Sequence, residues 1–433
     1  MGELPAVEPL PPRAPGRVPW VRSGAALLRD PTAFFARSRE RHGDTFLVDA
    51  FGYRLFCVFS PAGVRALYAL PEREASFGLA TYELVMRHKL PLELVAGRRA
   101  RPHDLFGSQE VESYLGHLEE AVARQIGELG ASGRFEVFGF ARRLGHRLGL
   151  ACWAGAEAAS PERLDRLIPL FDRLDTSASF VRPAQAFVAH ATRKWRERRA
   201  MHGIGAVIGE ILAGRRGAPP RGDFLEQIDA AWASEPAGAR EVGVARDVML
   251  IHMGAQSNLY AALAWTLVDL LLRPPLLEAV SKGDDDLLER CASESIRRAQ
   301  RSLTLRRVMQ PLDVALECGT YRLAPGVLIA TMLSVTNTSA APGLEGFDPA
   351  HYQGRRLAKQ VDLPARELVS TFGHGRHACP AQRFSISAIR IAVRRLLERF
   401  TLAPGFRRAE PRRRQIGAVA RAARACPVEY RLR

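Results

Sequence analysis

The chain has 433 residues and a mass of 47.7 kDa, which exceeds the roughly 100 to 200 residues of a usual domain. Hydrophobic residues make up 47% of the chain and charged residues 25%, a globular composition that excludes a disordered chain and a disulfide-stapled miniprotein. The formal net charge is +16, yet only four of the 62 basic residues are lysines.

The arginines are spread along the chain and do not form a nucleic-acid signature. The densest run, at residues 407–414, contains no interleaved aromatic side chains that could stack on bases. We therefore expect no nucleic-acid binding, and we interpret the charge as a solvated basic face that could dock an acidic protein.

No stretch of the chain predicts a membrane span. Uninterrupted apolar runs stay below the roughly 18 residues that a span needs. Residues 1–20 form a proline-rich segment that carries acids where a signal peptide would be apolar. We expect a soluble, cytoplasmic protein.

The first predicted elements are a helix and a small β region. Residues 30–40 have the apolar spacing of a helix. Residues 42–61 alternate between apolar and polar side chains, which predicts a two-stranded hairpin that turns near Gly52.

Helices dominate the middle of the chain. Apolar spacing is helical from residue 108 to residue 300, and one long helix is predicted from about Val242 to Leu272, ended by Pro274 and Pro275.

A second β region follows at residues 305–333, where a turn at Pro325 and Gly326 is expected to join two alternating segments. Since no long linker separates two halves, we expect a mainly α protein with small β-sheets, in a single domain that covers residues 1–433.

One of the six cysteines stands in a local sequence that favours a reactive sulfur. A helix is predicted to begin at Pro380, so Cys379 would be its N-cap, where first-turn N–H groups and the helix dipole favour a thiolate. Upstream, Gly373 and Gly375 allow the backbone to turn tightly against a flat ligand. A thiolate in this setting is a candidate metal ligand.

The flanking side chains add to this pattern. Phe372 can shield the sulfur, and His377 can donate a hydrogen bond to an anionic group. Cys426 provides an internal comparison: it also precedes a proline, but it has no glycine loop before it and no predicted helix after it. We interpret Cys426 as an ordinary buried thiol.

The pattern Phe372-x-x-Gly375-x-His377-x-Cys379 resembles the haem-binding loop of the cytochrome P450 family, the haem-thiolate monooxygenases. This resemblance implies the P450 fold in one large haem-enclosing domain, haem b as cofactor and Cys379 as the axial ligand of its iron. The opening of the chain also looks like the family's. One departure is Ala381, where the family usually has glycine.

A second resemblance lies upstream in Glu294-x-x-Arg297, whose spacing places both side chains on one face of a helix. In the family this pair braces the cysteine loop beneath the haem. The third member is normally an arginine, and His351 stands at its position here.

The middle of the long helix departs from the family pattern. The usual acid and alcohol that deliver protons to bound dioxygen are replaced by Ser257 and Asn258, and a shift of one residue still offers no carboxylate. Gln256-x-Asn258, with the Cys-Pro step, resembles the branch of sterol 7α- and 12α-hydroxylases and prostacyclin synthase. Alternatively, Gln256 and Asn258 satisfy a helix kink.

Substrate and propionate contacts are inferred from position in the family. Residues 76–91 correspond to its substrate-recognition loop, and their apolar side chains suit a bulky lipid-like ligand or an ordinary core. The substrate-contact candidates are Phe77, Tyr82 and Met86. The propionate candidates are Arg98, Arg99, Arg101 and His103, with Arg99 and His103 favoured.

The resemblance predicts a monooxygenase that hydroxylates a sterol-like or other lipid substrate with dioxygen. As in bacterial members, electrons would come from a ferredoxin or a flavodoxin. Proton delivery would then involve Ser257, Asn258 and Gln256. The alternative is a redox-neutral lipid peroxide isomerase or dehydratase of the prostacyclin synthase type. A non-enzymatic lipid carrier with an incidental thiol is the third interpretation.

Overall fold

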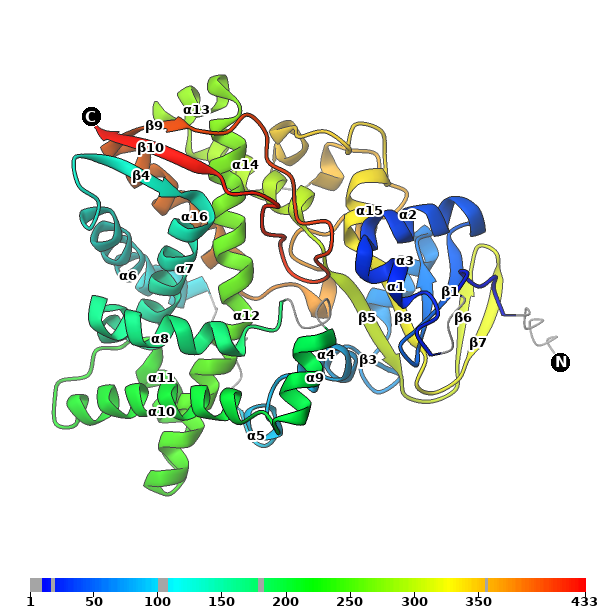
Figure 1. Cartoon of the computed structure of the whole chain (residues 1–433), viewed down its shortest axis with the longest axis horizontal. Helices are drawn as coiled ribbons and strands as arrows, with labels where there is room; N and C mark the ends of the chain where they lie inside the picture. Colours follow the sequence, from blue (N-terminus) through cyan, green and yellow to red (C-terminus); the bar gives the residue numbers. More distant parts are fainter. Residues whose placement is uncertain (1–9, 17–19, 100–107, 178–182, 355–356) are drawn as a thin grey trace. The chain divides into compact units, whose positions relative to one another are not determined.

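The computed structural model describes residues 10–16, 20–99, 108–177, 183–354 and 357–433 (Figure 1). Its residues form two compact units. The first unit comprises Met1–Met86, Ile296–Cys379 and Arg412–Ala420, and the second comprises Arg87–Ser295, Pro380–Pro411 and Arg421–Arg433. Helices with small sheets make up the chain, as the sequence predicts. The single domain over residues 1–433 stays a prediction.

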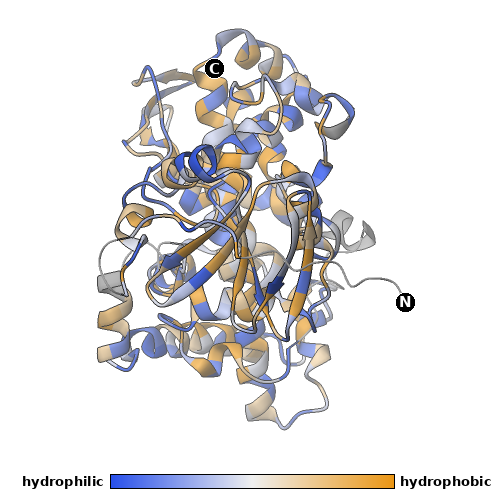
Figure 2. Cartoon of the chain, turned by 90° about the vertical axis from the view of Figure 1, so that its right-hand side faces the viewer, coloured by the Kyte–Doolittle hydropathy of each residue, from blue (hydrophilic) through white to orange (hydrophobic). Residues whose placement is uncertain are grey.

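A five-stranded sheet organises the first unit. Its strands, in spatial order, are β1 (Thr45–Ala50), β2 (Tyr53–Val58), β8 (Leu328–Met332), β5 (Leu303–Val308) and β3 (Ala75–Ser76). Orange hydrophobic residues run along strands of this unit in Figure 2. The core against the sheet includes Phe56, Val58, Leu67, Val308 and Ile329.

The predicted hairpin is confirmed as β1 and β2, which pair antiparallel from Thr45 opposite Val58 to Ala50 opposite Tyr53. Its two-residue turn consists of Phe51 and Gly52, both with positive φ, at 53° and 82°. This conformation matches the twist of a hairpin, and glycine adopts it without strain.

The predicted turn at Pro325 and Gly326 is confirmed, although the two strands that it joins do not pair with each other. That turn leads from β7 (Gly319–Leu323) to β8, and these strands lie in different sheets, because β7 pairs with β6 (Leu312–Leu316). All five residues of β8 are buried between β2 and β5. Alternation along a strand does not reveal which strand becomes its neighbour.

The helices of the first unit begin at recognisable caps. Asp30 caps α2 (Pro31–His42) by accepting the N–H of Ala33, which confirms the predicted helix. Other helical segments of this unit, besides short 3₁₀ turns, are α1 (Gly24–Arg29), α3 (Pro61–Ala69), α4 (Phe77–Thr81), the π-helical turn Tyr82–Met86 and α15 (Leu333–Ser339).

The second unit is a helical bundle with a three-stranded sheet. Its helices are α5 (Leu92–Val95), α6 (Ser108–Gly127), α7 (Val137–Trp153), α8 (Pro161–Leu174), α9 (Pro183–Ala191), α10 (Trp195–Arg215), α11 (Phe224–Ala231), α12 (Ala237–Leu271), α13 (Pro274–Ser281), most of α14 (Asp285–Ala299) and α16 (Gln382–Arg399). The sheet has the order β4 (Ser132–Glu136), β10 (Pro427–Leu432) and β9 (Phe400–Pro404).

The long central helix is confirmed as α12, which begins at Ala237, five residues earlier than predicted. It packs closely on α7, since a Cβ atom at Gly145 would lie 2.9 Å from the Cβ atom of Tyr260. Pro274 occupies the first turn of α13, where a proline loses no helical hydrogen bond. Among the described residues, no helix is both long and apolar enough to cross a membrane.

Candidate functional site

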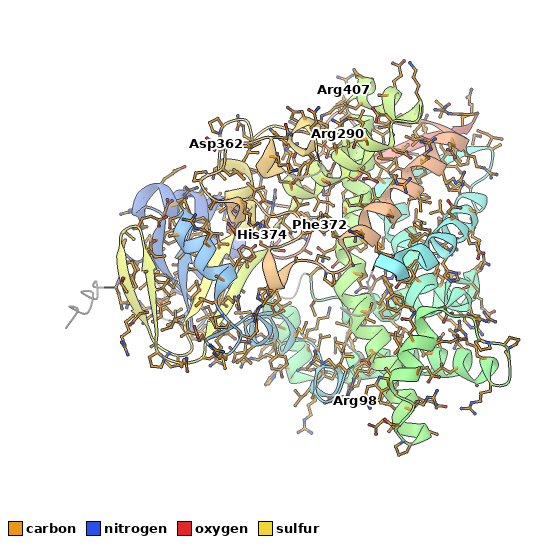
Figure 3. The ribbon with its side chains drawn as sticks, turned by 180° about the vertical axis from the view of Figure 1, so that it is seen from behind. Arg98, Arg290, Asp362, Phe372, His374 and Arg407 are labelled. Carbon is orange, nitrogen blue, oxygen red and sulfur yellow. The ribbon has the colours of Figure 1, made fainter. Side chains whose placement is uncertain are left out.

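The cysteine loop is closed on itself by backbone hydrogen bonds. The Cys379 N–H donates to the Phe372 carbonyl at 2.6 Å, and the His377 N–H donates to the His374 carbonyl at 3.0 Å. Phe372 and His374 are labelled in Figure 3, and both side chains are half-buried. The loop therefore holds Cys379 through its backbone rather than through packing of a large side chain.

No residue with a side chain fits at Gly373, the first glycine of the loop. Gly373 has a φ of +79°, and a Cβ atom there would lie 2.2 Å from the His377 carbonyl oxygen. Gly375 also has a positive φ, of +57°, but a Cβ atom there would meet no neighbour within 4 Å. The sequence pattern thus contains one glycine required by close approach and one required by backbone conformation alone.

The predicted helix start is wrong by two residues. Helix α16 begins at Gln382 with Ala381 as its N-cap, so Cys379 is not the N-cap. Ala378 is extended, and the Cys379 N–H is bonded to the Phe372 carbonyl inside the loop. The helix dipole therefore acts on the sulfur from a greater distance than expected.

Partial exposure distinguishes Cys379 from most other cysteines. Cys57 and Cys152 are fully buried, and burial raises their thiol pKa values. Burial raises the pKa of Cys291 to about 12. Cys318 is exposed, but it lies between β6 and β7 without a glycine loop. Cys379 is half-buried, so its sulfur can meet a ligand.

This donor set fits a metal that brings most of its own ligands. In the part of the chain that the structure describes, no cluster of three histidine, cysteine or acidic residues could hold a metal ion. A haem iron has four ring nitrogens and needs a single axial protein ligand, which a half-buried cysteine on a tight loop can provide.

The brace residue Arg297 is fully buried and reaches several carbonyl groups. Its guanidinium donates to the Leu344 carbonyl at 2.7 Å, to the Gly346 carbonyl at 2.9 Å and to the Asn337 carbonyl. Glu294 is also fully buried on α14. A buried guanidinium with three acceptors can fix the chain segments that supply them.

A chain of hydrogen bonds continues from Arg297 to the cysteine loop. The Asn337 amide donates to the carbonyls of Arg297 and Ser370, both at 3.0 Å, and accepts the Ser370 N–H at 2.8 Å. The Ser370 hydroxyl then accepts the Gly373 N–H at 3.0 Å. Arg297 therefore acts on the loop through Asn337 and Ser370.

Sequence reasoning missed Asn337 and Ser370. Asn337 lies in α15 and is fully buried, and Ser370 is 1% exposed. The available signal was a polar side chain in a stretch that is otherwise buried, since such a group needs hydrogen-bond partners.

His351, predicted as the third brace residue, is half-buried in a 3₁₀ turn over Pro349–Tyr352. The adjacent Tyr352 hydroxyl is hydrogen-bonded to the Thr371 hydroxyl, immediately before Phe372. The segment that carries His351 is therefore tied to the start of the cysteine loop by its neighbour.

The loop residue His377 contacts the predicted substrate-recognition segment. Its Nε2 atom lies 3.7 Å from the Glu72 carboxylate, and its ring centroid is 5.1 Å from that of Phe77. Burial and the nearby Arg306 lower the pKa of His377, although Glu72 opposes this shift. The imidazole is thus neutral near neutral pH and retains one N–H to donate.

The substrate-contact candidates differ in exposure. Phe77 is 38% exposed, while Tyr82 and Met86 are half-buried in the π-helical turn that follows α4. Leu84 in the same turn is buried, so it belongs to the core. A ligand could reach Phe77 without displacing the core.

The three polar residues in the middle of α12 do not point the same way. Gln256 and Ser257 are buried, whereas Asn258 is exposed. The Gln256 amide donates to the Phe171 carbonyl on α8 at 3.4 Å, and the Asn258 amide donates back to the Gly254 carbonyl at 3.4 Å. Asn258 therefore lies on the incompletely covered face of α12.

Two of the four residues predicted to bind a haem propionate lie in the described part of the chain. Arg99 is exposed and donates to the Val95 carbonyl. Arg98, labelled in Figure 3, pairs with Glu235 at 3.0 Å and covers the Trp232 ring. Arg101 and His103 lie outside the described residues.

Comparison with known proteins shows what the chain as a whole is similar to. No family model matches the chain. The chain is 20% identical over 424 residues to human "24-hydroxycholesterol 7-alpha-hydroxylase", covering 90% of this chain and 87% of that protein. It is 24% identical over 316 residues to "Sterol 14alpha-demethylase" of Mycobacterium tuberculosis, covering 67% of this chain and 68% of that protein.

The chain is also similar to "Cytochrome P450 monooxygenase ntnM" of Nectria sp, with 34% identity over 131 residues, which cover 28% of this chain and 24% of that protein. The mainly α architecture with small sheets is consistent with the fold of these relatives, whose names are those of oxidoreductases. The chain belongs to the cytochrome P450 family, and its enzyme class is that of the P450 monooxygenases.

Proposed function

We propose that this P450 is a haem-thiolate monooxygenase that inserts one oxygen atom of dioxygen into a lipophilic, sterol-like substrate. The observation that carries the proposal is the closed glycine loop with the half-buried Cys379. The sterol part rests on the names of the two long relatives, a sterol hydroxylase and a sterol demethylase.

Haem b, when bound, would supply the iron on which dioxygen is activated. The Cys379 sulfur would ligate that iron, and the backbone bond to Phe372 would hold the sulfur in place. His377 would donate its imidazole N–H to an anionic edge of the cofactor. Glu294, Arg297 and His351 would brace the loop from behind.

Proton delivery would rely on amide and hydroxyl groups of α12. Asn258 on the open face of the helix could hold a water molecule, and the Ser257 hydroxyl or a substrate hydroxyl could pass its proton. Gln256 is turned toward Phe171, so in this role it would orient its neighbours rather than meet the substrate.

The electron donor would be an acidic ferredoxin or flavodoxin of the cytoplasm. The net charge of +16 favours such a partner, because complementary charge accelerates association. Helix α16 contributes to the basic surface with the exposed residues Arg383, Arg395 and Arg399.

One observation favours the second candidate, a redox-neutral peroxide isomerase or dehydratase. The middle of α12 has Gln256, Ser257 and Asn258 where the family has an acid and an alcohol. A substrate that brings its own O–O bond needs no delivered protons, so such an enzyme tolerates this sequence.

An assay with a surrogate ferredoxin pair and a panel of sterols and fatty acid hydroperoxides tests the two candidates. The monooxygenase should consume NAD(P)H and dioxygen in step with formation of a hydroxylated sterol. Turnover of a hydroperoxide without reductant, with no coupled oxygen uptake on any substrate, would establish the isomerase instead.

A further inference from the structure

One carboxylate in the first unit contacts both the predicted substrate-recognition segment and the cysteine loop, and the proposed reaction gives it no role. Glu72 accepts the Phe77 N–H with both carboxylate oxygens, each at 3.1 Å. Its Oε1 atom accepts an N–H of Arg306 at 3.3 Å and lies 3.7 Å from Nε2 of His377. All four residues belong to one compact unit.

Arg306 is the fixed member of this cluster. It lies on β5, is 1% exposed, and donates to the carbonyls of Leu67 and Ala75 at 2.8 Å and of Tyr68 at 3.3 Å. A guanidinium held by three backbone carbonyls cannot follow a neighbour that moves. A displacement of Glu72 therefore changes its distance to the rest of the cluster.

Phe77 is the member that a ligand can reach. It is 38% exposed and is the first residue of α4. Its ring also packs on that of His377, with the centroids 5.1 Å apart and the planes at 43°. Because the N–H of Phe77 holds Glu72 while its ring contacts His377, a ligand that packs on Phe77 acts on both groups.

The Glu72 carboxylate is negatively charged near neutral pH. Burial raises its pKa, but hydrogen bonds from Phe77 and Ser76 and the charge of Arg306 outweigh this effect, so the pKa lies below its ordinary value. The side chain is 51% exposed, so solvent screens the charge in part. Its effect on a neighbouring group is therefore modest and depends on distance.

We propose that Glu72 is a positioning residue: through His377, its charge lowers the reduction potential of the haem for as long as the Phe77 N–H holds the carboxylate. This role rests on the proposed function, in which His377 donates its N–H to an anionic edge of the haem. It makes the electron affinity of the site depend on the conformation of α4.

The sign of the effect follows from charge. Reduction by one electron from the ferredoxin or flavodoxin donor adds one negative charge to the site and breaks no bond. A carboxylate beside His377 opposes that added charge and attracts the imidazole N–H away from the anionic edge of the cofactor. Removing the carboxylate charge should therefore raise the potential.

The hydrogen bonds from Phe77 connect this effect to ligand binding. A carboxylate that loses the shared N–H gains hydration by turning outward, and the Glu72 side chain already lies half in water. An apolar ligand that displaces the first turn of α4 would thus release Glu72 from His377. Electrons would then enter more readily when a substrate is present, and less dioxygen would be reduced without product.

The first test measures the midpoint potential of the ferric–ferrous couple by spectroelectrochemical titration of the ligand-free holoenzyme. Glu72→Gln keeps the shape of the side chain and removes its charge. At a fixed applied potential the ferrous-to-ferric ratio should rise about threefold, a factor suited to a half-exposed charge. This equals a shift of about 28 mV, at about 59 mV per tenfold change for one electron. An unchanged or lower potential would overturn the inference.

Glu83→Gln is the matched control for this measurement. Glu83 lies in the π-helical turn that follows α4, and its carboxylate, on a side chain that is 16% exposed, pairs with Arg307 of β5. Its loss loosens the same segment without changing the charge beside His377, so the potential should match that of the wild type. An equal rise in both variants would show that a loosened segment, and not the Glu72 charge, sets the potential.

The second test removes the N–H that holds the carboxylate. Phe77→Pro deletes this donor, and proline suits the position, because Phe77 opens α4 and Ser76 before it is extended, with a ψ of 122°. Phe77→Ala deletes the same ring but keeps the donor. The potential should be higher in Phe77→Pro than in Phe77→Ala, and the difference should vanish when Glu72→Gln is added to both. Equal potentials, or a difference that persists without the Glu72 charge, would contradict the link.

Hydrogen exchange separates this inference from the proposed function, because it needs no haem. In the full chain, Glu72→Ala should speed exchange both at the Phe77 N–H and in the cysteine loop, residues 372–379. If thiolate-ligated haem is absent while both segments respond, the link between α4 and the loop holds and the proposed function fails. If haem binds with its shifted Soret band, and neither the potential nor the exchange depends on Glu72, the inference fails alone.

Discussion

Two cysteines in this protein precede a proline, and their surroundings are opposite. Cys379 ends a loop with two left-handed glycines and is half-buried. Cys426 leads into strand β10, is 1% exposed, and its N–H donates to the Glu136 carboxylate at 3.1 Å. Burial, and then Glu136, raise the pKa of the Cys426 thiol to about 11.

The backbone around a thiol, and not the Cys-Pro step, decides the chemistry of that thiol. At Cys379 the backbone N–H donates to the Phe372 carbonyl. Because Gly373 has no side chain, its backbone can lie against the His377 carbonyl. At Cys426 the backbone leads directly into strand β10, which pairs with β4, and the residue is buried in the core. A buried thiol stays protonated and inert, whereas a half-buried one can bind a metal.

The largest effect is expected when the sulfur of each cysteine is removed in turn. Cys379→Ala should abolish the shifted Soret band that the reduced, carbon monoxide-bound protein shows with thiolate-ligated haem. Cys426→Ala should keep the band at full intensity. Survival of the band in Cys379→Ala would refute the assignment of the iron ligand.

The next largest effect on haem content is expected from a substitution of Glu294, one of the predicted brace residues behind the loop. Glu294→Ala removes a fully buried carboxylate one helical turn from the buried Arg297, and loss of one partner of a buried ion pair costs on the order of 3 to 5 kcal/mol, so the purified variant should contain little haem. Pyridine haemochrome absorbance per chain measures this. Glu136→Ala, at the Cys426 segment, serves as the matched control and should retain its haem. Normal haem content and turnover in Glu294→Ala would show that the pair is dispensable.

The two glycines of the loop should respond differently to alanine. Gly373→Ala forces a Cβ atom against the His377 carbonyl, so the loop must rearrange and haem content should fall strongly. Gly375→Ala meets open space and costs only the left-handed conformation, about 1 to 2 kcal/mol. Haem content and thermal unfolding compare them, and equal losses would mean that backbone conformation alone matters.

The smallest effect concerns the Cys426 thiol at high pH. Its pKa is raised from 9.0 to about 11 in the folded protein, so the unfolded state releases its proton first. Its contribution to stability is present below pH 9 and is lost as the pH rises toward 11. The melting temperature should fall less steeply over this range in Cys426→Ala than in the wild type. Parallel curves would show that the thiol titrates normally.

The sequence alone predicted the elements whose signals are local. The hairpin at Gly52, the helix near residues 30–40 and the long helix α12 follow from apolar spacing, turn residues and terminating prolines. The sequence also predicted the cysteine loop, because Gly373 and Gly375 allow the left-handed backbone conformation that few other residues adopt. The roles of its residues as haem contacts stay predictions.

Only the tertiary structure decided which distant segments meet. Strand β8 pairs with β2 and β5 instead of β7, and α16 begins at Gln382, two residues after the predicted start. Asn337 joins Arg297 to Ser370 across 40 and 33 residues of sequence. His146 and His252 are 106 positions apart, yet they share one hydrogen bond. Local propensity carries no information about such partners, since buried polar groups find them only when the core closes.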